Sequence, residues 1–266
     1  MIPNLLSIAG SDPSGGAGIQ ADLKTFAALG CYGMAALTAL TAQNTRGVSA
    51  VHVPPAAFLG DQIDAIFADI EVGAVKIGML ATGEVVALVA ERMRRHRPPF
   101  VVLDPVLVAA SGDSLGAPGV VEAMRATLIP AVTLVTPNLP EAARLADEPL
   151  AKTLDDMRGT AEKLHRLGPK AVLVKGGHLQ GSTSDDVLFD GKTHRVFSGR
   201  RIDTPNTHGT GCTLSSAIAA NLAKGLDLVA AIEAAKAYLT AALAESAALQ
   251  VGHGHGPVHH FHALWQ

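Results

Sequence analysis

Hydrophobic and polar residues follow two different periodicities along this chain, and segments of the two kinds take turns. Short apolar runs with many β-branched residues predict buried strands, whereas longer Ala- and Leu-rich segments have the three-to-four-residue spacing of helices. The predicted strands span 5–9, 36–41, 74–79, 100–103, 133–136 and 171–175. The predicted helices span 17–29, 56–70, 83–95, 119–127, 154–167, 213–224 and 228–248.

The order of these segments indicates the fold class. Several predicted strands are apolar throughout, as central strands of a parallel sheet must be when helices cover both faces. The segment 185–201, with an Asp190-Gly191 turn, predicts a β-hairpin near the sheet edge. We therefore expect a three-layer α/β/α, doubly wound fold around a mostly parallel sheet. No linker or repeat interrupts the chain, so residues 1–266 are expected to form a single domain.

Composition narrows the class of partner. The chain has 266 residues, 48% of them hydrophobic, which suffices for a sizeable core. A formal charge of −3 gives no broad attraction to nucleic acid or to anionic membranes, so small-molecule partners are favoured. Two separate cysteines, no export signal and no apolar run of about 20 residues favour a cytoplasmic, soluble protein.

A glycine-rich loop follows the first predicted strand, at the sheet edge where such folds bind ligands. Within it, residues 16–21 match the Gly-x-Gly-x-x-Ala dinucleotide fingerprint, which makes a dehydrogenase a rival interpretation. Two features oppose that rival. The connection from strand to helix is longer than the motif requires, and residues 36–42 contain no acidic residue for a ribose.

A second glycine-rich turn, Asn206 to Thr213, precedes an Ala- and Leu-rich helix. Its small residues would leave N–H groups free at the helix N-terminus, where the helix dipole favours a phosphoryl group in transfer. Cys212 lies where the same N-terminus would lower the pKa of a thiol and favour a thiolate base. The alternatives are a turn that only packs closely and an inert buried cysteine.

Several motifs occur in one order along nearly the whole chain: residues 9–22, 38–45, 76–80, 104–106, 136–142, 174–178, 209–212 and the tail 254–262. In this order they resemble the hydroxymethylpyrimidine/phosphomethylpyrimidine kinases of thiamine biosynthesis, within the ribokinase-like superfamily. The resemblance implies a phosphotransferase that uses ATP and Mg²⁺. It also makes a purification tag or a metal site in the His-rich tail less plausible.

The resemblance assigns the substrate pocket to Gln43, Gly10, Asp22, Met79 and Val106. Gln43 matches the residue that reads the pyrimidine, since an amide can donate to a ring nitrogen and accept from an exocyclic amine. The competing interpretations are a polar residue at a strand end for Gln43 and ordinary core residues for Met79 and Val106.

The resemblance also implies magnesium ligation by Asp104 and Glu141, whose hard oxygens suit that ion. Asn138, Lys175 and Thr210 are implied to bind the nucleotide. An Asn-x-x-Glu sequence at residues 138–141 is equally a helix-capping pattern, and Lys175 could belong to a buried ion pair.

The catalytic residues implied by the resemblance are Gly209, Thr210, Gly211 and Cys212 of the turn, together with Lys175. Sugar kinases of this fold usually have aspartate as the base, whereas this chain has Cys212. The pyrimidine kinases and some pyridoxal kinases share the cysteine.

Two other interpretations remain open from the sequence. A pyridoxal kinase would act on a comparable hydroxymethyl group, and a non-catalytic metabolite-binding protein could share the scaffold. The retained anion turn, lysine and metal ligands disfavour the non-catalytic protein. A homodimer is expected from the resemblance alone.

Overall fold

The computed structural model describes residues 1–107, 117–177, 179 and 181–265. Its strands form one sheet in the order β3-β2-β1-β4-β5-β6-β7-β8-β9. The strands are β1 (Asn4–Ser11), β2 (Tyr32–Asn44), β3 (Gly47–His52), β4 (Ala74–Ile77), β5 (Val101–Leu103), β6 (Leu134–Val135), β7 (Ala171–Lys175), β8 (Asp186–Phe189) and β9 (His194–Phe197). The strands from β2 to β7 in this order pair in parallel, and β3, β8 and β9 join antiparallel.

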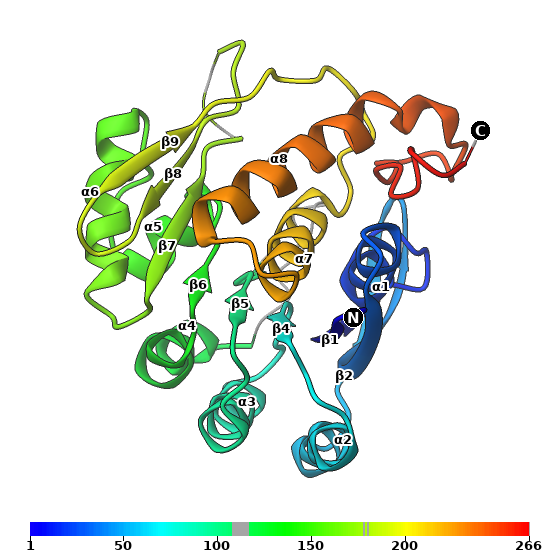
Figure 1. The fold of residues 1–266 in the computed structure, drawn as a ribbon, viewed down its shortest axis with the longest axis vertical. Helices are drawn as coiled ribbons and strands as arrows, with labels where there is room; N and C mark the ends of the chain where they lie inside the picture. The colour runs from blue at the N-terminus through cyan, green and yellow to red at the C-terminus, as the bar shows by residue number, and fades with distance from the viewer. Residues whose placement is uncertain (108–116, 178, 180, 266) are drawn as a thin grey trace.

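Helices cover both faces of the sheet (Figure 1). One face of the sheet is covered by helices α1 (Gly18–Ala28), α7 (Thr210–Ala223) and α8 (Leu228–Ala244). Their side chains share a core with strand residues such as Ala74 and Val102. Helices α2 (Ala56–Asp69), α3 (Gly83–His96), α4 (Val120–Ala123), α5 (Leu139–Ala146) and α6 (Leu154–His165) pack on the other, against Val75 and Leu103. Neighbouring strand residues thus enter opposite cores, as the pleat of a strand requires. The predicted three-layer, mostly parallel fold is confirmed.

The structure corrects several predicted elements. Strand β2 is twice as long as predicted and continues into β3, an exposed edge strand without an apolar run. The helix predicted over 119–127 is α-helical only to Ala123; a π-helical turn, Met124–Leu128, follows, and Pro130 opens the next 3₁₀ turn. Proline lacks the N–H that an α-helix would need there.

The hairpin predicted at 185–201 is present as β8 and β9. His178, the last residue of one motif, lies outside the described residues.

A buried ion pair joins the layers beneath the carboxyl ends of the strands. Lys76 of β4 and Asp22 of α1 are both fully buried, with Nζ 2.8 Å from Oδ1 and 2.9 Å from Oδ2. Ser7 of β1 and Ser216 of α7 donate hydrogen bonds to the same carboxylate, at 2.6 and 2.7 Å. Burial alone would lower the pKa of Lys76, but Asp22 raises it, so the lysine stays charged.

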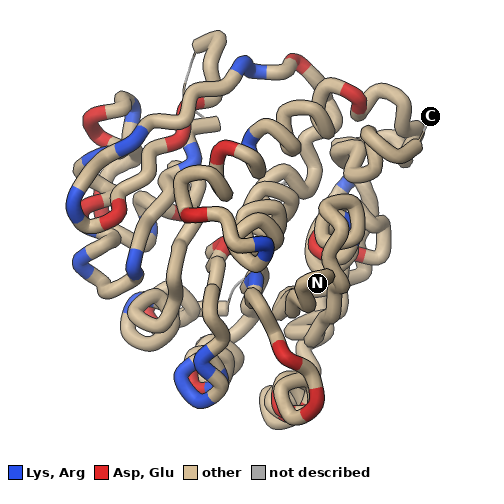
Figure 2. Tube along the Cα trace, viewed as in Figure 1, with Lys and Arg blue, Asp and Glu red and all other residues tan. Residues whose placement is uncertain are grey.

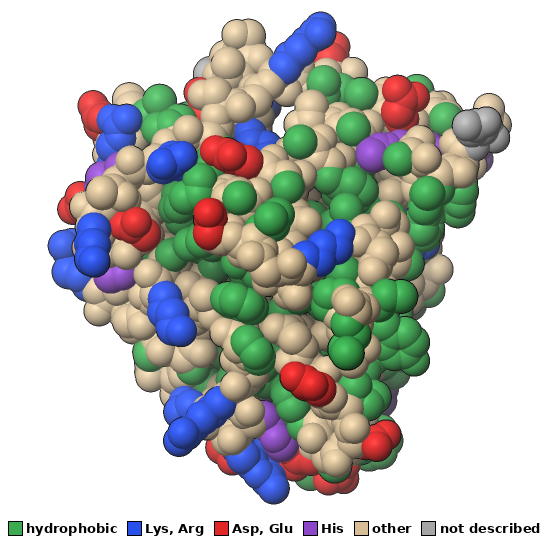
Figure 3. Space-filling model, in the orientation of Figure 1, with side chains coloured by type: hydrophobic (Ala, Val, Ile, Leu, Met, Phe, Trp, Pro, Cys, Tyr) green, Lys and Arg blue, Asp and Glu red, His purple; other side chains and the backbone are tan. Residues whose placement is uncertain are grey.

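Acidic and basic residues are both spread around the molecule (Figure 2), and hydrophobic and charged side chains intermingle on the face shown in Figure 3. This mixture agrees with the small formal net charge. Among the described residues, no helix combines the length and apolar character needed to cross a bilayer.

Removing one partner of the buried pair is predicted to be costly. Lys76→Met leaves the Asp22 carboxylate buried without a cation, so the free energy of unfolding is expected to fall by about 3–5 kcal/mol. The matched double variant Asp22→Asn/Lys76→Met carries neither charge and is expected to regain much of that loss. Urea denaturation measures both, and a single variant within about 1 kcal/mol of wild type would contradict the prediction.

Candidate active site

A cavity of about 620 Å³ opens at the carboxyl ends of the parallel strands. Almost all of the residues predicted for the site line it: Gly10, Gln43, Met79, Asp104, Val106, Asn138, Glu141, Lys175, Gly209, Thr210, Gly211 and Cys212. Asp22 is the exception, because it lies fully buried beneath the cavity in its pair with Lys76. The structure therefore places Asp22 as a support of the cavity floor and not in its lining.

Met79 and Val106 lie on an apolar wall of the cavity. Gly10 adjoins this wall, because a Cβ added to Gly10 would lie 3.0 Å from Met79 Sδ.

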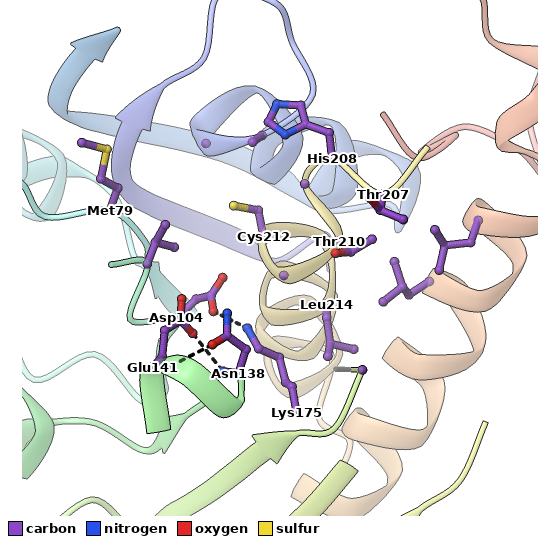
Figure 4. Close-up of a pocket in the computed structure, with 18 of the residues that line it drawn as sticks. Met79, Asp104, Asn138, Glu141, Lys175, Thr207, His208, Thr210, Cys212 and Leu214 are labelled. Carbon is purple, nitrogen blue, oxygen red and sulfur yellow. Dashed lines mark hydrogen bonds and ion pairs between the residues drawn. The ribbon is translucent and has the colours of Figure 1, made fainter. Parts of the chain in front are cut away.

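Helix α7 points its N-terminus into this cavity (Figure 4). Gly209 caps the helix with a φ of 80°, and a Cβ there would lie 1.9 Å from the Gly16 carbonyl oxygen, so only glycine fits. Within the described residues, the N–H groups of Gly211 and Cys212 have no hydrogen-bond partner. Free N–H groups at a helix N-terminus form an anion site. The helix begins at Thr210, three residues earlier than predicted, which puts Cys212 in its first turn.

Cys212 is a thiol and not the expected thiolate. Burial raises its pKa to about 11, the carboxylates of Asp22 and Asp104 add to the rise, and the Lys76 ammonium opposes it. The expectation of a lowered pKa is therefore wrong, because desolvation outweighs the favourable charges around this side chain.

A charged cluster that includes Asp104, Glu141 and Lys175 lies beside the first turns of α7, below Met79 in the view of Figure 4. Lys175, at the end of β7, donates to Asp104 Oδ1 at 2.6 Å, so it is an ion pair in this structure. Burial would lower the pKa of Lys175, but Asp104 and Glu141 raise it. A Cβ added to Gly211 would lie 3.2 Å from both Asp104 Oδ2 and Lys175 Nζ, so the cluster adjoins the anion turn.

Asn138 and Glu141 form a capping box at the start of α5. Asn138 Oδ1 accepts from the Glu141 N–H at 2.9 Å, and Glu141 Oε2 accepts from the Asn138 N–H at 2.8 Å. The capping interpretation of the sequence is thus confirmed. Burial raises the pKa of Glu141 to about 7, with Asp104 adding to the rise and Lys175 opposing it.

This cluster fits a magnesium ion. Two buried carboxylates, Asp104 and Glu141, share the single ammonium group of Lys175, and a second cation would relieve their mutual repulsion. Magnesium is commonly held by one or two carboxylates together with phosphate oxygens and water. The described residues contain no cluster of three or more His, Cys, Asp or Glu that could hold a metal alone.

Backbone N–H groups of the glycine-rich loop after β1 donate hydrogen bonds to a carboxylate of the same loop, that of Asp12. The N–H groups of Ser14, Gly16 and Ala17 donate to Asp12 at 2.9–3.2 Å, and His208 Nε2 lies 2.8 Å from Asp12 Oδ2. These N–H groups are therefore not free for a pyrophosphate, which removes the basis for the dehydrogenase interpretation. Neither Asp12 nor His208 was predicted as a site residue, although Asp12 lies in the motif 9–22 and His208 in the glycine-rich turn Asn206 to Thr213.

The cavity lining also contains charged residues that were not predicted from the sequence. Lys236 pairs with Asp186 at 2.5 Å, and Arg201 donates to four backbone carbonyls between Gly177 and Thr183. Two exposed arginines that line the cavity, Arg144 and Arg200, make no ion pair within the described part of the chain. Their positive charge is therefore available to a ligand.

The C-terminal segment 252–260 crosses from the β2–β3 hairpin to α7, beside elements from the start of the chain (Figure 1). The Gly254 and His255 N–H groups donate to Thr45, and the His208 N–H donates to the Gly256 carbonyl. His260 Nε2 lies 3.1 Å from Thr213 Oγ1, and burial lowers the pKa of His260 to about 3. The His-rich tail is thus a structural part of the site.

Comparisons with known proteins agree with this geometry. The family model described as phosphomethylpyrimidine kinase matches residues 12–259. Hydroxymethylpyrimidine/phosphomethylpyrimidine kinases from Rhizobium meliloti and Salmonella typhimurium are 54% and 52% identical, each over 98% of both chains. An ADP complex of Bacillus subtilis pyridoxal kinase matches with a TM-score of 0.89 and 41% identity over 98% of both chains.

The raised pKa of Cys212 predicts how its thiol reacts. Only the thiolate is alkylated, so in a Cys31→Ser background the iodoacetamide rate should rise about tenfold per pH unit up to pH 9.5 without a plateau. Mass spectrometry of the modified peptide measures this rate. A plateau near pH 7 would show that Cys212 is a thiolate after all.

Proposed function

The chain belongs to the phosphomethylpyrimidine kinase family, and we propose that it transfers the γ-phosphoryl group of ATP to 4-amino-5-hydroxymethyl-2-methylpyrimidine and then to its monophosphate. The observation that carries this proposal is the position of the α7 N-terminus. Its free N–H groups lie between His208, whose ring is 3.5 Å from the Gln43 amide, and the cluster of Asp104, Glu141 and Lys175 (Figure 4). An acceptor and a polyphosphate can therefore approach it from opposite sides.

Each side of the cavity has a role in the proposed transfer. Gln43 orients the acceptor against the wall that contains Gly10, Met79 and Val106. The hydroxymethyl oxygen forms a bond to the γ-phosphorus while the bond to the ADP oxygen breaks. The N–H groups of Gly211 and Cys212, with Gly209 and Thr210 shaping the turn, stabilise the charge on the phosphoryl oxygens.

Lys175 and Asn138 are proposed to bind the nucleotide phosphates, and Asp104 and Glu141 to hold Mg²⁺. Mg²⁺ held by these two carboxylates would supply positive charge against the phosphate oxygens. Arg144 and Arg200, which line the cavity, add positive charge that has no ion-pair partner among the described residues. A single domain over residues 1–266 belongs to the same proposal and is supported by the one continuous sheet of the described residues. A homodimer and a cytoplasmic location stay proposals from the sequence alone.

A pyridoxal kinase is the second candidate, and the structural match to the Bacillus subtilis enzyme favours it. The pyrimidine kinases are more similar in sequence, at 52–54% against 41% identity.

ATP consumption tests the choice of substrate. Purified protein with Mg²⁺ is expected to turn over the hydroxymethylpyrimidine and its monophosphate, with the mono- and diphosphate products identified by mass. Chelation of Mg²⁺ should abolish both reactions. Turnover of pyridoxal alone would favour the second candidate, and no ATP turnover with any acceptor would favour a binding protein.

The two acceptors are expected to depend differently on Cys212. The alcohol must lose a proton, and the base would be the small thiolate fraction of Cys212, which the Lys76 ammonium favours against the effect of burial. A phosphate monoester is already ionised at neutral pH and needs no such base. Cys212→Ala should therefore slow the first transfer about 100-fold or more and the second only a few-fold. Single-turnover assays with each acceptor measure this, with Cys31→Ala as the control. Equal rates for variant and wild type would remove Cys212 from the mechanism, and equal losses in both steps would contradict its role as a base.

A further inference from the structure

Gln43 lies where the long strand β2 departs from regular pairing. Ala42 pairs with Ala50 and Gln43 with Val48, so β3 contains one additional residue at this point. Such a bulge re-aims the side chains beside it. Thr41 and Gln43, two residues apart, share one side of the strand, and both line the cavity.

The Thr41 hydroxyl holds one end of the Gln43 amide. The Thr41 hydroxyl has one proton, which it shares between two acceptors: the Ser11 carbonyl oxygen at 2.8 Å, which takes the shorter hydrogen bond, and Gln43 Oε1 at 3.1 Å. The carbonyl belongs to the end of β1, so the hydroxyl is fixed to the centre of the sheet. The amide is thereby tied to backbone that does not depend on a ligand.

His208 confines the other end of the amide. His208 Nε2 is 3.5 Å from Gln43 Nε2 and 2.8 Å from Asp12 Oδ2. Burial opposes ionisation of Asp12, but His208 and Ser14 lower its pKa, so it is a carboxylate at neutral pH. A carboxylate only accepts hydrogen bonds, hence His208 Nε2 carries a proton and donates it to Asp12. It cannot also accept from the Gln43 amine, whose N–H groups therefore remain available to the cavity.

The histidine itself has little freedom. Its N–H donates to the Gly256 carbonyl at 3.0 Å, and its ring fills the space beside Gly16, where an added Cβ would lie 2.3 Å from His208 Cδ2. The Gln43 amide thus lies between two groups that are each anchored to a different part of the fold.

We propose that Thr41 and His208 are positioning residues that fix the plane of the Gln43 amide and so select an acceptor ring with a nitrogen next to an exocyclic amine. The inference rests on the proposed function. A fixed amide can donate to the ring nitrogen and accept from the amine in two parallel hydrogen bonds. With the hydroxymethyl groups superposed, pyridoxal has a formyl oxygen where the pyrimidine has its amine, and a hydroxyl where the pyrimidine has its ring nitrogen. The formyl oxygen only accepts hydrogen bonds, so an amide oxygen fixed toward this position finds no donor there. Fixing the amide beforehand lowers the entropy lost on binding.

Thr41→Val tests the proposal, because it keeps the shape of the side chain and removes the hydroxyl. Its kcat/KM for the hydroxymethylpyrimidine is expected to fall about tenfold, mostly through KM, while kcat/KM for pyridoxal changes less than about twofold. Thr41→Ser keeps the hydroxyl and should retain the wild-type ratio of the two values. His208→Leu should lower the same ratio, and its effect combined with Thr41→Val should be less than additive.

A substrate analogue separates positioning from general distortion. The hydroxymethylpyrimidine lacking its exocyclic amine cannot make the second hydrogen bond, so the Thr41→Val penalty should largely disappear with this analogue. An equal penalty with and without the amine, or equal losses for pyrimidine and pyridoxal, would overturn the inference. Wild-type protein that does not turn over the pyrimidine would overturn the proposed function instead.

Discussion

The buried pair of Lys76 and Asp22 is the interaction on which the rest of the site depends. Opposite charges that are fully removed from water are tolerated only when they satisfy each other and when hydroxyl groups complete their hydrogen bonds, as Ser7 and Ser216 do here. These four residues come from β4, α1, β1 and α7. The requirement to keep the charges together therefore fixes the N-terminus of α7 relative to the sheet, and with it the distance from Cys212 to the charged cluster.

The sequence predicted those parts of the fold that follow from local pattern. Fully apolar runs identified the central strands, because only a sheet covered on both faces buries every side chain of a strand. The edge strand β3 escaped prediction since its residues are mostly exposed, and the π-helical turn at Met124–Leu128 has the same apolar spacing as an α-helix. The family motifs brought together the residues of the cavity, but they could not show that Asp22 lies beneath it. They also could not show that desolvation outweighs the helix N-terminus at Cys212, because burial depends on the whole fold.

Local and functional requirements coincide at the start of α5. Asn138 and Glu141 cap the helix, and the same hydrogen bonds hold the Glu141 carboxylate next to Asp104. A capping box fixes its side chains whether or not a ligand is present. In the same way, Lys175 and Lys236 are each held by a carboxylate. The polar groups of the cavity are consequently fixed by other side chains of the protein, and such fixed groups are the ones that stabilise a transition state most effectively.

The contacts of the C-terminal segment 252–260 have a consequence for how the protein is made. Synthesis proceeds from the N-terminus, and the β2–β3 hairpin, His208 and α7 all leave the ribosome before this segment does. Until then Thr45 lacks its partners, and the Gly256 carbonyl that holds the His208 backbone is missing. A growing chain can thus assemble its sheet while its turn at residues 208–212 is still unsupported. The nascent polypeptide acquires a complete phosphoryl-transfer centre only when residues 252–260 have emerged.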